Sequence, residues 1–281
     1  MPPVDAVLTW GAAAHRDLPW RKTRDPWAIL VAETMLQQTP VPRVVPKYVS
    51  FLEQFPDTAT CAAAPVADII KAWSGLGYNR RAVALHGAAG RLVELGRFPR
   101  EIRELCELPG VGPYTARAVL AFAFEADVAV VDTNIARVLA RWHGRRLSAR
   151  VAQDLANAWV PDARGWAWNQ ALMDLGATVC TARHPSCQRC PLAAQCAWRG
   201  GPDPDPATGS AFVTRPQSRF TGSDREGRGR LLRAIQSAPV GAGSLAWVMG
   251  WPDQDERAER VAASLVGDRL AVHDGGVYRL P

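Results

Sequence analysis

Up to about residue 200, apolar residues recur with helical spacing, and short segments rich in proline and glycine separate the runs. This pattern favours amphipathic helices joined by turns, and the sequence shows no sustained alternation of the kind that marks strands. One helix is predicted to begin with Pro26, after the capping residue Asp25, and to end before Pro40. Similar helical patterns cover residues 66–77, 81–96, 114–124 and 133–144. We therefore predict that the first 200 residues are almost wholly α-helical.

The pattern changes beyond residue 200. Residues 201–222 are rich in Gly, Pro, Asp and Arg without an apolar period, so we predict a linker. Three short helical patterns follow, at residues 230–238, 243–251 and 255–270. Residues 269–281 are typical of two strands around an Asp-Gly-Gly turn. Three helices and a hairpin predict a small winged-helix-like α+β domain over residues 223–281.

Composition narrows the class of protein. With 48% hydrophobic residues and eleven tryptophans in 281 residues, the chain can bury a sizeable core. Charges or prolines interrupt every apolar run before it is long enough to span a membrane. The N-terminus also lacks the pattern of a secretory signal, so we expect a cytoplasmic protein without membrane contact. The net charge of +6 suits a polyanionic partner such as nucleic acid.

Four of the six cysteines lie within seventeen residues, at Cys180, Cys187, Cys190 and Cys196. In a reducing compartment, clustered cysteines bind metal more often than they form disulfides. A zinc site, a disulfide pair and an iron–sulfur site are the alternatives, and the single compact run favours iron and sulfur because one loop can wrap around a cubane. Such a centre is expected to hold the fold rather than to catalyse. Cys61 and Cys106 lie far from this run and are predicted to pack in the core.

A glycine-rich turn connects two helical patterns in LPGVGPYTARAV, residues 108–119. Glycine permits a tight turn, and the amides of Gly110, Val111 and Gly112, close to a helix start, can point at a phosphate. Turns between helices commonly use glycine anyway, so the motif gains weight from the basic, cysteine-bearing chain around it. Arg183, between the first two clustered cysteines, is a second candidate for phosphate contact.

Two carboxylates are candidates for chemistry. Glu33 is the only charged residue from Pro26 to Pro42, and this apolar setting is expected to raise its pKa so that it can deliver a proton at neutral pH. The alternative is that Glu33 faces solvent from an amphipathic helix. Asp132 ends the apolar run VAVVD before a helix, so its simplest role is an N-cap.

Taken together, these motifs resemble a known family. LPGVGPYTARAV followed by VVDTNIARVLAR is similar to the helix-hairpin-helix and catalytic aspartate of the DNA glycosylase superfamily. The spacing C-x6-C-x2-C-x5-C resembles the 4Fe-4S loop of its endonuclease III and adenine glycosylase branches. LPWR, AETMLQQT, WSGLGYNRRA and WNQALMDLGATVCT extend the resemblance to the adenine DNA glycosylases, in collinear order from about residue 15 to 198.

The resemblance implies a mostly α-helical helix-hairpin-helix glycosylase fold with a 4Fe-4S cluster. One predicted subdomain, residues 1–25 and 134–200, bears the cluster, and the other, residues 26–133, bears the hairpin. Only about eighty residues follow the last cysteine, too few for the Nudix-like domain that such proteins usually add to recognise 8-oxoguanine.

The resemblance also implies catalytic roles. Glu33 matches the acid that protonates the leaving base, and Asp132 matches the aspartate that stabilises the sugar cation, with Asn134 as its polar neighbour. Tyr114 stands where bifunctional relatives carry a lysine that forms a Schiff base. We therefore expect a monofunctional enzyme that leaves an abasic site.

Further matched positions complete the predicted site. Three are expected to contact the flipped base: Trp20, Arg21 and Gln170. Four are expected to contact the duplex beside the opposite base: Gln37, Gln38, Thr39 and Tyr78. The expected partner is double-stranded DNA with a mismatch or an oxidised guanine, bound by a monomer in the bacterial nucleoid.

The leading hypothesis is acid-assisted removal of adenine paired with 8-oxoguanine or guanine. One alternative is a glycosylase for another mismatched base, such as thymine in a T:G pair. Another is a non-catalytic iron–sulfur protein that binds DNA. The LQQT stretch and Gln170 favour adenine, and the joint presence of Glu33 and Asp132 argues against a non-catalytic protein.

Overall fold

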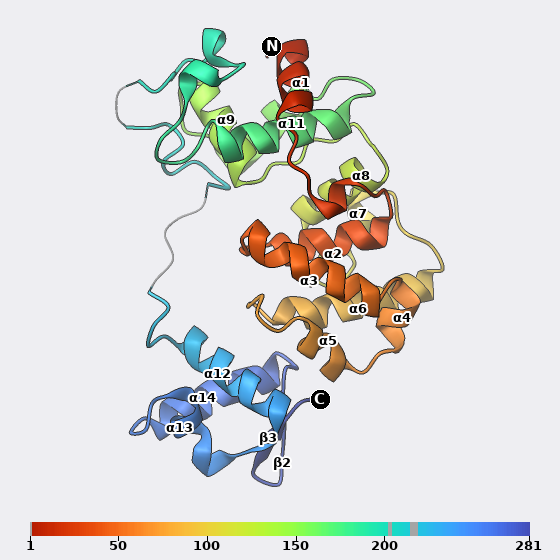
Figure 1. Ribbon diagram of the computed structural model, residues 1–281, viewed down its shortest axis with the longest axis vertical. Helices are drawn as coiled ribbons and strands as arrows, with labels where there is room; N and C mark the ends of the chain where they lie inside the picture. The colour runs from red at the N-terminus through yellow and green to blue at the C-terminus, as the bar shows by residue number, and fades with distance from the viewer. Residues whose placement is uncertain (1, 202–203, 214–218) are drawn as a thin grey trace. The chain divides into compact units, whose positions relative to one another are not determined.

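The computed structural model describes residues 2–201, 204–213 and 219–281, and the chain divides into two compact units (Figure 1). The first unit comprises Met1–Leu30, Pro99–Glu107 and Val111–Pro216. The second comprises Val31–Phe98, Leu108–Gly110 and Gln217–Pro281. Helix α2 (Pro26–Leu36) crosses from the first unit into the second.

Helices make up the regular structure described in the first unit. The elements wholly inside it are α1 (Val4–Ala13), η1 (Pro19–Arg21), α7 (Ile102–Cys106), α8 (Pro113–Ala123), α9 (Thr133–Trp142), α10 (Ala149–Trp159), α11 (Gly165–Thr178), η2 (Cys187–Arg189) and η3 (Ala193–Gln195). Helix α11 packs against α1 and α9, and α9 also packs against α10. Trp142, Trp159 and Trp168 meet edge to face in this core, with ring centroids 5.4 and 6.4 Å apart.

The second unit contains two groups of helices. Those before residue 99 are α3 (Val41–Gln54), α4 (Thr58–Ala63), α5 (Val66–Ala72) and α6 (Arg80–Leu95). The C-terminal group consists of α12 (Asp224–Ser237), β1 (Val240–Gly241), η4 (Ala242–Ser244), α13 (Leu245–Met249), α14 (Asp255–Gly267), β2 (Val272–Asp274) and β3 (Val277–Arg279).

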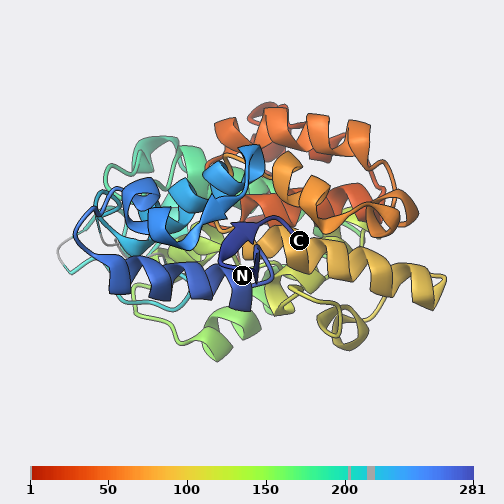
Figure 2. The same ribbon diagram turned by 90° about the horizontal axis from the view of Figure 1, so that it is seen from below.

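The C-terminal region has the predicted three helices and strand hairpin. Helices α12, α13 and α14 pack against one another, as the blue ribbons of Figures 1 and 2 show. The turn at Gly275 and Gly276 joins β2 to β3, and both glycines have positive φ angles. Strand β1 adds a third, antiparallel strand, in the order β1-β3-β2. The sequence did not predict β1, because two residues are too few for an alternation.

The described residues confirm the mostly helical prediction for the first 200 residues. Helix α2 begins at Pro26, where Asp25 accepts hydrogen bonds from the amides of Trp27 and Ala28, and it ends at Leu36, before Pro40. Within the part of the chain that the structure describes, none of the helices combines the length and the apolar character needed to cross a membrane.

Part of the predicted linker 201–222 is packed against the first unit. Ala207 is buried in its core, and the hydroxyl of Ser210 accepts a hydrogen bond from the amide of Leu147. Asp205 forms an ion pair with Arg141. Residues 202–203 and 214–218 of the predicted linker lie outside the described residues. We name residues 205–211 the strap, because they run along the cysteine-bearing unit.

Candidate functional site

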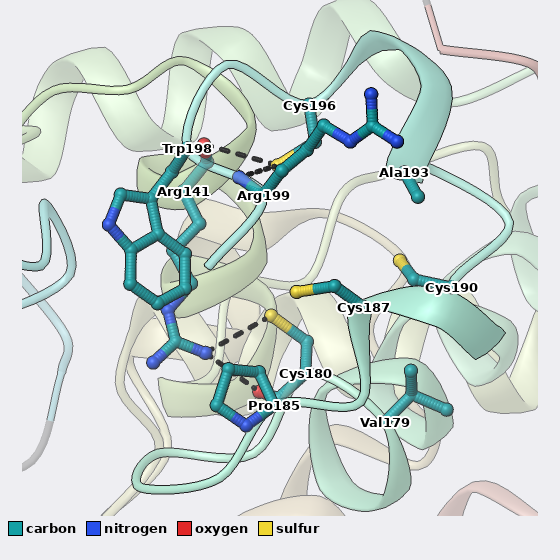
Figure 3. Close-up of a pocket in the computed structure, with 10 residues that line it drawn as sticks. All are labelled: Arg141, Val179, Cys180, Pro185, Cys187, Cys190, Ala193, Cys196, Trp198 and Arg199. Atoms are coloured by element: carbon teal, nitrogen blue, oxygen red, sulfur yellow. Dashed lines mark hydrogen bonds between the residues drawn. The ribbon is translucent and has the colours of Figure 1, made fainter. Parts of the chain in front are cut away.

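The four clustered cysteines line one cavity of the first unit (Figure 3). Cys180 follows the end of α11, Cys187 begins η2, and Cys196 follows η3. Short 3-10 turns suit this segment because they let the chain curve around a centre. Arg141, Pro185 and Trp198 close other sides of the same cavity.

The donor set fits an iron–sulfur cluster. All six cysteines are free thiols, so the disulfide alternative is wrong for this structure. No three metal-ligating side chains of the described residues converge on a position for a single ion, whereas four sulfurs share one cavity. A polynuclear cluster suits this wider arrangement because each thiolate binds a different iron. Of the two remaining cysteines, Cys61 is fully buried as predicted and Cys106 is partly buried.

Arg141 of α9 holds the start of the cysteine loop. Its guanidinium donates to the carbonyl oxygens of Thr181 and Ala182, at 2.7 and 3.0 Å, and lies 3.3 Å from Sγ of Cys180. It also stacks over the ring of Trp198 and pairs with Asp205 at 2.6 Å. One buried cation therefore joins α9, the cysteine loop and the strap.

A second arginine connects the cysteine loop to Asp132. Arg137, one turn before Arg141, donates from Nε to the carbonyl of Cys180 at 2.7 Å and from Nη2 to Oδ1 of Asn134 at 2.9 Å. Nδ2 of Asn134 donates in turn to Oδ2 of Asp132 at 2.8 Å. A Cβ atom at Gly176 would lie 2.6 Å from Cβ of Asn134, so glycine is required for α11 to approach α9 here. This chain of hydrogen bonds fixes the carboxylate relative to a cysteine of the cluster loop.

Asp132 is the N-cap of α9, as its sequence context predicts. Oδ1 accepts a hydrogen bond from the amide of Ile135 at 2.7 Å. Burial raises the pKa of the Asp132 carboxyl, against the hydrogen bonds from Ile135 and Asn134 and the charge of Arg137. A carboxylate held in this way is rigid and poorly hydrated, which favours an electrostatic role toward a developing cation.

The residues predicted to contact a flipped base all lie in the first unit, and all are buried. Trp20 and Arg21 belong to η1, and Gln170 belongs to α11. Arg21 forms a two-pronged ion pair with Asp174, at 2.7 and 2.9 Å, and Arg16 also binds this aspartate. Burial opposes ionisation of Asp174, but the two arginines keep its pKa low. Arg21 therefore holds η1 against α11, and its contact with a base stays a prediction.

Glu33 lies in the third turn of α2, in the second unit. Its side chain is buried, with the residue 5% exposed, so the alternative of a solvent-facing glutamate is wrong. Its helix neighbours Ile29, Leu30 and Val31 are at most 2% exposed. This apolar setting is the one expected of a carboxylic acid that gives up a proton.

The glycine turn packs closely on its surroundings. In the second unit, a Cβ atom at Gly110 would lie 2.7 Å from Cβ of Ala84, and Gly110 has a φ angle of 77°, so both space and conformation require glycine. In the first unit, Val111 is buried and Gly112 is the N-cap of α8. Tyr114 follows in the first turn of that helix and is partly buried. Arg183 is exposed in the cysteine loop, and its contact with a phosphate stays a prediction.

The residues predicted to contact the duplex beside the opposite base lie in two turns of the second unit. Residues 37–39 follow α2, and residues 76–78 lie between α5 and α6. Gln37 is partly buried and Gln38 is exposed, while Tyr78 is 42% exposed. Thr39 is buried, and its hydroxyl donates to the carbonyl of Leu76 at 3.2 Å. Its placement favours joining the two turns over direct contact with DNA.

Several residues that organise the site were not predicted. They are Arg81, Arg137, Arg141, Asp174 and Asp205. The four-residue spacing of Arg137 and Arg141 in an apolar helix was the available signal, since it places two cations on one buried face. The others act across long separations in the sequence, which no local pattern reveals.

Comparison with known proteins identifies the class. Residues 31–161 match the profile of the HhH-GPD superfamily of base excision DNA repair proteins, and residues 180–196 match that of the iron–sulfur binding domain of endonuclease III. The fold and the cysteine loop thus define a helix-hairpin-helix base excision repair protein with a 4Fe-4S cluster, as the sequence predicted.

Full-length similarity identifies the family. The adenine DNA glycosylase of Mycolicibacterium smegmatis is 42% identical over 275 residues, covering 94% of this chain and 90% of that protein. The chain belongs to the adenine DNA glycosylase family. This match also covers most of the short C-terminal region, which this relative therefore shares with the chain.

Two solved structures support the fold. A thermostable thymine-DNA glycosylase has a TM-score of 0.67 and 33% identity, covering 70% of this chain and 94% of its own. A trapped endonuclease III–DNA covalent intermediate has a TM-score of 0.62 and 25% identity, covering 70% of this chain and 93% of its own.

Proposed function

We propose that this protein is a monofunctional DNA glycosylase that removes adenine paired with 8-oxoguanine or guanine. The observation that carries the proposal is the similarity to an adenine DNA glycosylase over nearly the whole chain. The endonuclease III structure with bound DNA supports double-stranded DNA as the partner. We infer that the protein acts as a monomer on the bacterial chromosome.

In the proposed reaction, Glu33 donates a proton to the adenine ring so that the base leaves as a neutral molecule. The N-glycosidic bond breaks as positive charge develops on the sugar. Asp132 must be ionised to stabilise that cation, and the hydrogen bonds from Ile135 and Asn134 keep its oxygens in place. Water then attacks the anomeric carbon and gives up a proton to the Glu33 carboxylate, which leaves an abasic site and restores the acid. Cys180, Cys187, Cys190 and Cys196 would hold the 4Fe-4S cluster, and the bound cluster would cross-link the loop that carries Arg183.

Strand cleavage is not part of the proposed activity. A lyase step needs an amine that can form a Schiff base with the opened sugar. Tyr114 offers a phenol at the matching position, and the last of the three lysines in the chain is Lys71. We therefore expect strand breaks only after alkali treatment of the abasic product.

Single-turnover excision tests the proposal. Duplexes with A:8-oxoG, A:G, T:G and A:T pairs are treated with the purified protein, and product strands are measured with and without alkali. Glu33→Gln and Asp132→Asn are compared with the native protein, and each is expected to lose at least about a hundredfold in rate. Asparagine caps a helix as well as aspartate does, so Asp132→Asn should keep the native fold. Native rates in both variants would refute the assigned roles.

Thymine in a T:G pair is the second candidate substrate. The thymine-DNA glycosylase with the same fold and 33% identity favours it. The adenine relative is more similar and covers more of the chain, so adenine remains the proposed base. Release of thymine from the T:G duplex without release of adenine from the A:8-oxoG duplex would reverse this order.

A further inference from the structure

Arg81 connects the two turns that carry the predicted DNA contacts. It lies at the start of α6, in the second unit. Its guanidinium donates hydrogen bonds to oxygen atoms of two separate segments, residues 34–39 and residues 76–78. The acceptors are the carbonyl oxygens of Thr34, Met35, Gln37, Leu76, Gly77 and Tyr78 and the hydroxyl of Thr39, at 2.6–3.4 Å.

The donor capacity of Arg81 is fully used inside the protein. A guanidinium has five N–H groups, and here seven oxygens surround them, so some of the bonds are shared. The group also lies 5.4 Å from the ring centroid of Trp73 and 5.5 Å from that of Tyr78. Arg81 therefore has little left to offer a phosphate. Its contacts are those of a structural clamp.

The clamp holds two backbone positions in an unusual conformation. Gln38 has a φ angle of 57° and Tyr78 one of 47°, in the left-handed region that non-glycine residues rarely adopt. Arg81 binds oxygens on both sides of Gln38, namely Gln37 O and Thr39 Oγ1, and it binds the carbonyl of Tyr78 itself. Such strain persists only where the surroundings enforce it, and it is common at binding sites.

Arg81 also caps α2. Thr34 and Met35 belong to the last turn of this helix, where carbonyl oxygens lack partners within the helix and the dipole favours a cation. Glu33 immediately precedes this pair. The side chain of Arg81 thus fixes the end of α2, which carries the proposed acid Glu33. It also fixes the two turns, residues 37–39 and 76–78.

We propose that Arg81 is a positioning residue that joins residues 37–39 and 76–78 into one rigid edge, from which the side chains of Gln38 and Tyr78 enter the duplex at the target base pair, beside the opposite base. Arg81 acts through these two turns and does not itself contact DNA. This inference rests on the proposed function, because the role of Gln38 and Tyr78 in DNA binding belongs to it.

Neighbouring Arg80 provides a matched control. It lies on the same helix turn and carries the same charge, but its side chain is 75% exposed and pairs with Asp268 at 3.5 Å. If charge alone mattered, Arg80→Met and Arg81→Met would weaken DNA binding equally, with the same change in salt dependence. If geometry matters, Arg81→Lys should fail although it keeps the charge, because an ammonium cannot reproduce a planar fork of donors.

The test compares Arg81→Lys, Arg81→Met and Arg80→Met with the native protein. Excision is measured at saturating enzyme, and binding is measured on duplexes with and without the mismatch. A 2-aminopurine base beside the target adenine reports local unstacking by its fluorescence. Both Arg81 variants should lose at least about tenfold in the excision rate and lose the fluorescence rise on binding, whereas Arg80→Met should change each by less than about threefold.

Two further measurements keep the outcome interpretable. Circular dichroism and the visible absorption of the cluster identify a variant that fails to fold. If both Arg81 variants fail to fold, Thr39→Val is measured instead. It removes only the hydroxyl that bridges the two turns, and it should lower both the excision rate and the fluorescence rise. Native-like fluorescence and rate in Arg81→Lys would overturn the inference. A native protein that unstacks the duplex but releases no base would contradict the proposed function and leave the role of Arg81 standing.

Discussion

Two irregular regions, the cysteine loop of the first unit and the paired turns of the second, are each held by one arginine, which is buried in the first region and partly buried in the second. Arg141 binds carbonyl oxygens of the cysteine loop and stacks on Trp198. Arg81 binds carbonyl oxygens of the turns and stacks on Trp73. Both segments lack a regular ladder of backbone hydrogen bonds, so a guanidinium with five donors satisfies several carbonyl oxygens at once.

The two arginines differ in their charge balance. Burial disfavours the charge of Arg141, but its hydrogen bonds with Asp205 and Cys180 outweigh this effect and raise its pKa. Burial lowers the pKa of Arg81 to about 10, and its acceptors are neutral carbonyl and hydroxyl oxygens. Arg81 nevertheless stays charged at neutral pH.

This difference in charge balance fits what each region is proposed to bind. A cluster ligated by four thiolates is anionic, and Arg141 balances that charge with Asp205 as its second partner. We propose that the paired turns contact DNA, and the acceptors of Arg81 there are neutral oxygens, so no acidic side chain adds negative charge beside the phosphates. From this comparison we expect Arg141 to support retention of the cluster and Arg81 to support the proposed binding of DNA, so variants of the two residues should affect different properties.

The largest effect is expected for Arg141→Met. The change leaves the carboxylate of Asp205 and several carbonyl oxygens without their donor, at a cost of about 3–5 kcal/mol. Iron and sulfide content should fall, and the melting temperature measured by loss of the visible cluster absorption should drop. Arg145→Met, an exposed position three residues from the end of α9, is the control. Full iron and sulfide content in Arg141→Met would contradict the role of Arg141 in cluster retention.

A smaller effect, about 2 kcal/mol at neutral pH, is expected for Asp205→Asn. Burial opposes ionisation of Asp205, but the hydrogen bonds from Arg141 and from the amide of Ala207 hold its pKa below the usual value. A lowered carboxyl pKa stabilises the fold above the pKa of the unfolded chain, and this contribution disappears as pH falls through the folded value. Melting temperatures of the native protein and the variant should therefore converge in acid.

The exposed pair of Arg150 and Asp154 provides the control for that experiment. Its atoms are 3.8 Å apart and both side chains are largely exposed, so Asp154→Asn should change stability by less than about 0.5 kcal/mol at any pH. A difference between native protein and Asp205→Asn that stays constant down to strongly acid pH would show that the strap is held by something other than this ion pair.

The smallest effect on stability is expected for Gln38→Gly. Glycine adopts the left-handed conformation without a steric cost, so relief of strain should stabilise the protein by about 1 kcal/mol or less in urea unfolding. DNA affinity should fall at the same time, because the side chain is lost. Gln37→Gly, whose backbone is not in that region, should instead destabilise slightly. If both changes stabilise the protein, the claim that the backbone is strained at Gln38 in particular is wrong.

The sequence was most informative where chemistry depends on local spacing. The intervals between Cys180 and Cys196 predicted the cluster, and the position of Asp132 after an apolar run predicted the N-cap that the structure shows. Helix α2 was predicted with its cap, because Asp25 and Pro26 act on their immediate neighbours.

Contacts between distant segments could not be predicted in this way. Composition favoured a linker at residues 201–222, yet Asp205 is held by a partner 64 positions earlier. The sequence placed Arg81 within a motif but did not predict its role, because that role depends on the meeting of two turns about 40 residues apart. Local propensity contains no information on which carbonyl oxygens a long cation will reach.

The identity of the released base tests the central claim most directly. A duplex with A:8-oxoG and another with T:G are incubated together with excess native protein, and the free bases are separated by chromatography. The account predicts that adenine is released in a single turnover and that thymine stays in its strand. Release of thymine ahead of adenine, or release of neither base despite tight binding to both duplexes, would contradict it.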